Sequence, residues 1–479
     1  MSKWEIFRGH ILKTSLIIIS FIETFYIAYQ PTPRDGLEAM WLLPFLFGTV
    51  LIFFGEIIKY HKGGVGLKVY YIIAIIRFLV QPILIVLSKG ALSFNRMPNA
   101  EPNSYRVAIV TLCIELLMAC FAIKRWYPKY INKISSTKSS IKKNQGKLRA
   151  SGWFMIGACL FVLAIRFQIW FPAMNILALK SASSDTSILI EATLINCVKA
   201  IIFVNFLRLA KDSPKYSKKY YAYLILALVA GIFNFIIYFG ANRSFIVESA
   251  IASIALIVFV FPKYKKRVLT ITVPISVVII IMMFVTKQFG LENANQFTFS
   301  AISIKDISNI IEEYTNGLWT VARSYQAALG LTVTQSVEAL SKDITDGLLV
   351  VLDIPGLDWI ASLTSDFSSS SDIMKQSLGS FDRGQMLSFS GGMLIIGGQV
   401  SGWILVLLAN YMVIKILVKL EVLSKQCNNF YYKYMYLWMA ILFGLTHCYT
   451  LQTLIYSWSK FILFYWAIIW INNKFVFRK

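Results

Sequence analysis

Long stretches of apolar residues, separated by short polar connections, dominate the hydropathy pattern of this chain. Leu224 to Phe239 and Val268 to Val285 run without a charge, close to the ~20 residues that a helix needs to cross a bilayer. The continuous runs lack the alternation typical of a membrane β-barrel. We therefore predict an all-α integral membrane protein with about twelve transmembrane helices, near residues 11–29, 41–59, 69–90, 105–123, 151–171, 188–208, 220–239, 245–262, 268–286, 400–418, 434–448 and 453–472.

One segment interrupts this pattern, because residues 288–387 form a connection far longer than ordinary loops. Periodic apolar positions in Ile302 to Leu329 and in Val333 to Leu352 predict short helices, some of them amphipathic and lying on the bilayer surface. The serine-rich stretch Ser365 to Ser371 is expected to be mobile. The chain thus divides into residues 1–287 with nine helices, a large and partly helical loop at 288–387, and residues 388–479 with three helices.

The positions of the charges orient these helices. The formal net charge of +23 comes mainly from basic residues in short connections, which is typical of the cytoplasmic side. With twelve spans, every strongly basic connection and both termini fall on that side. The 288–387 loop falls outside and holds half of the 24 acidic residues. The basic residues therefore report topology and contact with membrane lipids rather than binding to nucleic acid.

Several kinds of chemistry lack their sequence signals. The six cysteines lie in or beside apolar stretches without a CxxC pair, so neither a disulfide framework nor a metal cluster is expected. The chain has no GxxxxGK[ST], HExxH or GxSxG motif and no paired carboxylates on the cytoplasmic side. These absences argue against ATP-driven transport, zinc hydrolysis and nucleotide-sugar transfer, and we expect no cofactor and no metal.

Charged residues inside or at the ends of membrane helices are functional candidates, because burial of a charge is costly. Arg166 lies in the outer half of the fifth predicted span, and Arg243 lies in an outer turn with Glu248 about one helical turn below. Their guanidinium groups suit a phosphate or diphosphate ligand. Arg77 in the third span fits a structural ion pair better, with Glu56, Glu115 or Glu191 as possible partners.

The large loop offers further candidates for binding a sugar or a phosphate. Arg323 lies between Trp319 and Tyr325, and carbohydrate sites often contain such aromatic neighbours. A second arginine, Arg383, follows Asp382, a candidate base. Both arginines have an alternative role in neutralising the acidic loop.

Two features follow the loop toward the end of the chain. His447 lies at the outer end of a predicted span and is another candidate base, although the pattern favours a packed, hydrogen-bonded structural histidine. The chain around it interrupts the penultimate helix and could form a re-entrant turn. Glycines from Gly391 to Gly402 predict a broken or closely packed helix at the start of the tenth span.

Three of these features together resemble the Wzy-type polymerases of O-antigen, capsule and exopolysaccharide repeat units. They are the Gly-x-x-Arg turn from Gly240 to Arg243, the large late outer loop, and the return from Phe389 through the glycines to Trp403. The resemblance covers roughly residues 220–420, and the topology extends it over the chain.

The resemblance implies a GT-C-like glycosyltransferase of the bacterial cytoplasmic membrane. It would transfer a growing glycan from undecaprenyl diphosphate onto the terminal sugar of another lipid-linked repeat unit, without a metal. Arginines would stabilise the diphosphate leaving group, while Asp382 or His447 would deprotonate the acceptor hydroxyl. The residues implied in these roles are Arg166, Arg243, Arg323 and Arg383. A chain-length regulator and a flippase are possible partners.

Two other classes of membrane protein share part of the pattern. An O-antigen-ligase-like transferase has the same topology, with finished glycan as its substrate. A flippase or transporter also suits twelve spans, although the internal repeats common in transporters are not evident in this sequence.

Overall fold

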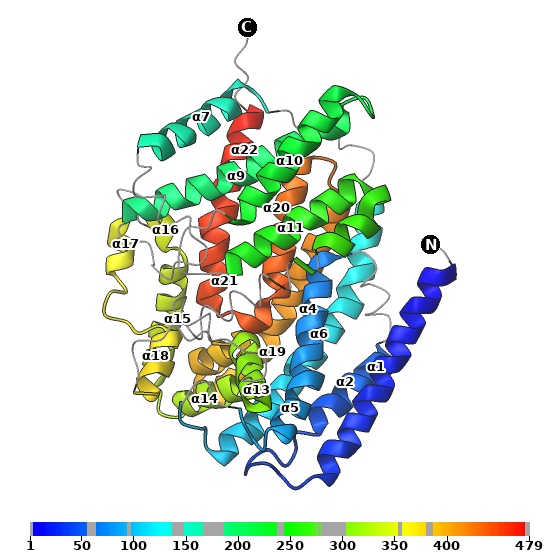
Figure 1. The fold of residues 1–479 in the computed structure, drawn as a ribbon. Coiled ribbons are helices and arrows are strands. Elements are labelled where there is room, and N and C mark those ends of the chain that lie inside the picture. The colour runs from blue at the N-terminus through cyan, green and yellow to red at the C-terminus, as the bar shows by residue number, and fades with distance from the viewer. Residues whose placement is uncertain are drawn as a thin grey trace. The chain divides into compact units, whose positions relative to one another are not determined.

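A computed structural model describes residues 3–54, 64–92, 97–136, 148–165, 186–236, 244–272, 274–275, 278, 303–352, 357–379 and 387–474. Within these ranges the chain forms helices and no β-strand (Figure 1).

Six of the described helical stretches are long and apolar enough to cross a membrane, and a bent pair can supply a seventh. The six are His10–Tyr29, Val65–Leu87, Pro102–Asn132, Ile190–Asp212, Ser401–Gln426 and Leu451–Lys474. The bent pair is Phe245–Val260 with Pro262–Thr272, which meet at 114°. This confirms the prediction of a helical protein with several membrane-type spans.

The described helices fall into two compact units. The first unit comprises Met1–Thr137, Ile302–Val422 and Leu442–Tyr456, so the large loop groups with helices that precede and follow it in the sequence. Its amino-terminal helices are α1 (Lys3–Tyr29), α2 (Leu42–Phe53), α4 (Val65–Ile75), the π-helix η1 (Ile76–Val80), α5 (Gln81–Leu87) and α6 (Pro102–Ser136). α4, η1 and α5 follow one another without a break and form a single span.

The large loop is helical in its described part, as the periodicity predicts. Its helices are α13 (Ile304–Thr315), α14 (Leu318–Ala328), α15 (Val333–Gly347), α16 (Leu349–Leu352), α17 (Asp358–Ser362) and α18 (Ser370–Ser377). α13 packs along α5, and α14 packs along α6, at the same end of the unit in Figure 1. The loop therefore belongs to the core of the first unit.

The serine-rich stretch Ser365 to Ser371, which is predicted to be mobile, leads into α18 and supplies its first residues. Ser369 is the N-cap of α18. Its Oγ accepts a hydrogen bond from the Asp372 backbone N–H at 3.1 Å, and the Asp372 carboxylate accepts one from the Ser369 N–H. Ser370 is fully buried and donates from N and Oγ to Asp343 at 3.0 and 2.6 Å. These serines supply the capping that a helix N-terminus needs.

The glycine-rich return forms the broken helix that the sequence predicts. α19 (Phe389–Gln426) contains a non-helical Gly398 with φ of 61° and ψ of −165°, a backbone conformation open chiefly to glycine. A Cβ added at Gly397 would lie 2.4 Å from the Gly402 Cα. α19 extends beyond the first unit, which ends here at Val422.

The predicted interruption near His447 is also present. α20 (Phe430–Gly444) ends before the short 3₁₀ helix η5 (Thr446–Cys448), and α21 (Leu451–Ser457) follows. The Glu421 carboxylate accepts a hydrogen bond from the Leu67 N–H at 3.2 Å and another from the Gly66 N–H. This carboxylate caps the start of α4 from a distant part of the chain.

The second unit comprises Lys138–Ala301, Leu423–Ile441 and Ser457–Lys479. Its described helices include α7 (Ala150–Ile165), α9 (Thr186–Asp212), α10 (Lys218–Ile236), α11 (Ser244–Val260), the 3₁₀ helix η2 (Pro262–Tyr264), most of α20, the π-helix η6 (Trp458–Leu463) and α22 (Phe464–Lys474). Asn234 on α10 donates to Tyr434 Oη at 2.8 Å and to Ser253 Oγ at 3.0 Å, which joins three helices through buried polar groups.

Candidate functional site

Arg77 lies in the π-helical part of the span Val65–Leu87 and is only 1% exposed. Its Nη1 forms an ion pair with Glu115 on the span Pro102–Asn132, and Glu115 is equally buried. Its Nη2 donates to the Asn316 carbonyl at 3.0 Å. The structural pairing expected for Arg77 is therefore present, at a wide helical turn of the kind often found at functional sites.

His447 lies against this ion pair and is 2% exposed. Its Nδ1 contacts Glu115 Oε1 and lies 2.7 Å from Arg77 Nη1. Because one carboxylate oxygen attracts both groups, we assign the hydrogen to Nδ1, which then donates to Glu115. The Tyr70 ring packs on the imidazole with ring centroids 4.4 Å apart.

The other imidazole nitrogen, His447 Nε2, is buried and has no hydrogen-bond partner among the described residues. In the assigned tautomer this nitrogen is an acceptor. A buried carboxylate that holds Nδ1–H while Nε2 stays open is the arrangement that prepares a histidine to act as a base.

The second oxygen of Glu115 binds α19. Ser390 Oγ donates to Glu115 Oε2, and Asn410 Nδ2 donates to Ser390 Oγ at 3.0 Å. Both residues are buried. Glu115 therefore has partners on three sides, and its orientation is fixed by two helices and the η5 turn.

Glu312 on α13 extends the network into the large loop. Its Oε1 accepts from the Thr320 N–H at 3.0 Å and from the Thr320 Oγ1 at 3.3 Å, and its Oε2 accepts from Gln81 Nε2. Burial raises the pKa of Glu312 to about 7, against the opposing effects of these hydrogen bonds and of Arg77. Glu312 can therefore gain or lose a proton near neutral pH.

Asn316 connects the loop to the histidine turn. It ends α13 in the left-handed conformation, with φ of 47°, which asparagine adopts more readily than most residues. Its Nδ2 donates to the Cys448 carbonyl at 2.8 Å. We call the whole network the buried polar cluster; its members are Arg77, Gln81, Glu115, Glu312, Asn316, Ser390, Asn410 and His447.

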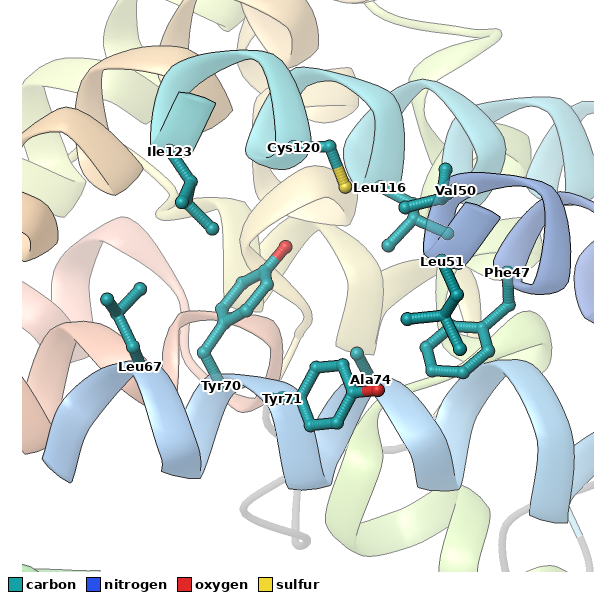
Figure 2. A pocket seen from close by; sticks show the side chains of 10 residues that line it. All are labelled: Phe47, Val50, Leu51, Leu67, Tyr70, Tyr71, Ala74, Leu116, Cys120 and Ile123. Carbon is teal, nitrogen blue, oxygen red and sulfur yellow. The ribbon is translucent and has the colours of Figure 1, made fainter. Parts of the chain in front are cut away.

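An apolar pocket borders the buried polar cluster. Figure 2 shows that its lining comes from α2, α4 and α6, with the Tyr70 hydroxyl directed toward α6. The lining residues are Phe47, Val50, Leu51, Leu67, Tyr70, Tyr71, Ala74, Leu116, Cys120 and Ile123. Tyr70 lines the pocket and packs on His447, so one side chain separates the pocket from the imidazole.

Three of the predicted loop residues lie on α14, near the buried polar cluster in sequence but with other partners. Arg323 is 5% exposed and donates to Gln326 Oε1 at 2.8 Å and to the Ser377 carbonyl at 3.2 Å. Trp319 is buried, and its Nε1 donates to the Pro98 carbonyl at 3.1 Å. Tyr325 is half-buried. Both hydrogen-bond partners of Arg323 are uncharged groups.

The other predicted site residues are not brought together with His447. Glu248 is fully buried on α11 in the second unit. Four predicted residues lie outside the described part of the chain: Arg166, Arg243, Asp382 and Arg383.

The sequence analysis gave no functional role to Glu115 and Glu312. Glu115 is the one charged residue between Val107 and Ile123, a signal that was available in the sequence. Glu312 shares one face of α13 with Ser308 and Thr315, all three buried. That spacing of polar residues marks a face turned toward the protein, but many acids in the loop made Glu312 hard to single out.

No group of three or more His, Cys, Asp and Glu side chains in the described ranges is arranged to hold a metal ion. The comparisons with known proteins found no matching protein family, no matching curated protein and no matching solved structure. The functional argument therefore rests on the chemistry of the buried polar cluster.

Proposed function

We propose that the chain is a polysaccharide polymerase that joins undecaprenyl-diphosphate-linked repeat units in the bacterial cytoplasmic membrane. The observation that carries this proposal is the environment of His447: the Glu115 carboxylate accepts the hydrogen bond from Nδ1–H and also pairs with Arg77, while Nε2 is buried and has no hydrogen-bond partner among the described residues. A membrane glycosyltransferase that uses no metal needs such a base for its acceptor hydroxyl.

In the proposed reaction, the acceptor hydroxyl oxygen attacks the anomeric carbon of the donor glycan. His447 Nε2 takes the hydroxyl proton, and the bond between that carbon and the diphosphate oxygen breaks. Undecaprenyl diphosphate leaves with the negative charge. Glu115 stabilises the imidazolium that forms, as the carboxylate of a catalytic triad does.

The diphosphate requires cationic partners, for which the sequence offers Arg166, Arg243, Arg323 and Arg383. We further propose twelve spans of GT-C-like arrangement, with both termini cytoplasmic and the 288–387 loop outside. The growing chain would then be handled together with a flippase and a chain-length regulator.

The deciding experiment is His447→Asn in a deletion strain of the native host. The asparagine amide can still donate to Glu115, so the polar cluster keeps its main contact, but the base at Nε2 is lost. We expect surface glycan limited to single repeat units, at a protein level equal to wild type. His10→Asn is the matched control, because His10 is exposed on α1, and it should restore long polymer. Long polymer from His447→Asn would refute the role of His447 as base.

A second candidate function is proton-coupled transport, including flipping of lipid-linked oligosaccharide. The observation that favours it is a buried Arg77–Glu115–His447 network whose arginine and glutamate lie in membrane-type spans, since charged groups there often form proton relays. The deletion strain separates the candidates. A polymerase defect leaves single-unit surface glycan, a flippase defect accumulates lipid-linked units in the cytoplasm, and a ligase defect leaves no glycan attached.

A further inference from the structure

Helix α15 has three distinct sides. The buried side carries small or polar residues: Ser336, Ala339, Asp343 and Gly347. An apolar stripe faces outward instead, with Val333 82%, Val337 58% and Ile344 38% exposed. The intervals of four and seven residues place these three side chains on one face. A third side is polar and includes Glu338.

This pattern is the reverse of an ordinary surface helix, which buries its apolar stripe against the protein. The small residues of α15 permit close contact, since a Cβ at Gly347 would lie 2.7 Å from the Ile455 Cβ. The polar residues have partners inside: Asp343 accepts both hydrogen bonds of Ser370, and Ser336 Oγ donates to the Ile395 carbonyl at 3.4 Å. The polar residues Asp343 and Ser336 on the inward face thus have hydrogen-bond partners inside the protein. The apolar stripe is on another face of the helix.

Helix α13 likewise has buried polar residues and exposed apolar ones. Its buried residues are Ser308, Glu312 and Thr315, and Ser308 Oγ donates to the Ala91 carbonyl at 2.6 Å. Its exposed apolar residues are Ile304 at 48%, Ile307 at 39% and Tyr314 at 48%. Two helices of one loop therefore turn apolar side chains away from the protein.

Helices α13 and α15 each contact a membrane-type span. α15 ends against the first turns of the span Leu451–Lys474, where Gln452 donates to Asp346 at 3.3 Å and Ile455 meets Gly347. α13 packs along α5, which ends the span Val65–Leu87. Both helices therefore contact membrane-type spans near an end of the span, the part of a span that lies close to the bilayer interface.

A third helix of the loop carries an exposed tryptophan. α17 packs on α15 and α16, and its Trp359 is 60% exposed, next to Leu363 at 64%. Tryptophan is enriched at the boundary between hydrocarbon and headgroups.

We infer that α13, α15 and α17 lie in the interfacial region of the lipid bilayer, with their apolar stripes turned toward the acyl chains. The polar side of α15 faces the headgroups and water. This inference does not depend on the proposed reaction. It makes the large loop a membrane-bound element rather than one projecting into water.

The test measures the surroundings of two neighbouring positions in the full-length protein, reconstituted in phosphatidylethanolamine–phosphatidylglycerol nanodiscs. Val337→Cys and Glu338→Cys are each spin-labelled in a background with the six natural cysteines replaced. Power saturation then compares contact with oxygen, which concentrates in lipid, and with a water-soluble nickel chelate. If the background variant does not stay monodisperse, the natural cysteines are kept and the signal of labelled wild type is subtracted.

We expect the label at 337 to respond more to oxygen and the label at 338 to respond more to nickel. Val333→Cys should behave like Val337→Cys and provides a second reading of the stripe. Equal response to nickel at 337 and 338 would show that the stripe faces water and would overturn the inference. Protection of 337 from both reagents would show a protein partner, such as a second copy, and would overturn it too.

Discussion

Replacement of Glu312 by glutamine removes a buried group whose charge depends on pH near neutrality. Glu312 is fully buried and accepts hydrogen bonds from Thr320 and Gln81. Glutamine has nearly the same shape and stays neutral at every pH. The substitution therefore tests the electrostatic consequence of burial with little change in packing.

The expected change in stability follows from the pKa of Glu312, which burial raises from 4.5 to about 7. A folded-state pKa above the unfolded value means that the folded protein holds the proton more tightly. This contribution to stability is complete below pH 4.5 and is lost as the pH rises through 7. The difference corresponds to about 3 kcal/mol. The wild-type protein should therefore lose stability between pH 5 and pH 8, and Glu312→Gln should lose less.

Thermal unfolding in detergent, followed by tryptophan fluorescence from pH 5 to pH 8.5, measures this difference as several degrees in apparent Tm. Burial also raises the pKa of Asp343, to about 6, so Asp343 lowers stability with rising pH in the same direction. Both proteins contain Asp343, so its effect cancels in the comparison. Glu313→Gln is the matched control, because the neighbouring Glu313 is half-exposed. Parallel curves for wild type and Glu312→Gln, or an equal effect of Glu313→Gln, would refute the reasoning.

Two further substitutions test how the first unit is held together. Glu421→Ala should lower the free energy of unfolding by an amount on the order of 1–3 kcal/mol, measured as a lower apparent Tm, because the Gly66 N–H loses its buried acceptor; Glu421→Gln, which keeps an acceptor oxygen, should lower it less. Gly397→Ala should reduce folded yield in size-exclusion chromatography, because its Cβ would lie 2.4 Å from the Gly402 Cα. Gly330→Ala, whose Cβ meets nothing within 4 Å, should leave the yield unchanged.

The interiors of the membrane helices could be predicted from sequence, but their ends could not. The predicted interval 105–123 lies inside α6, which continues to Ser136. Hydropathy detects only the part of a helix that hydrocarbon can accommodate. A helix that extends into water with lysines and arginines satisfies its backbone hydrogen bonds equally well, so the charged residues do not end it.

An acidic partner for Arg77 was predictable, because a charge in hydrocarbon needs one and few acids lie in the spans, and Glu115 is one of the three acids that the sequence offered. The position of His447 beside that pair was not. Its contact crosses 370 residues of sequence, and no local pattern reports a contact at such separation. His447 was a candidate only because it lies where a helix is interrupted.

The large loop shows why its acidic composition was misleading. Composition treats each acid as a surface charge, yet Glu312 and Asp343 are fully buried, and each occupies the inward side of its helix. Polar residues can face inward here because the spans themselves offer polar partners, such as Gln81 and the Ala91 carbonyl. The apolar residues of the same helices are then left for lipid. In a membrane protein the two sides of an amphipathic helix do not identify inside and outside, and only the contacts decide which side is which.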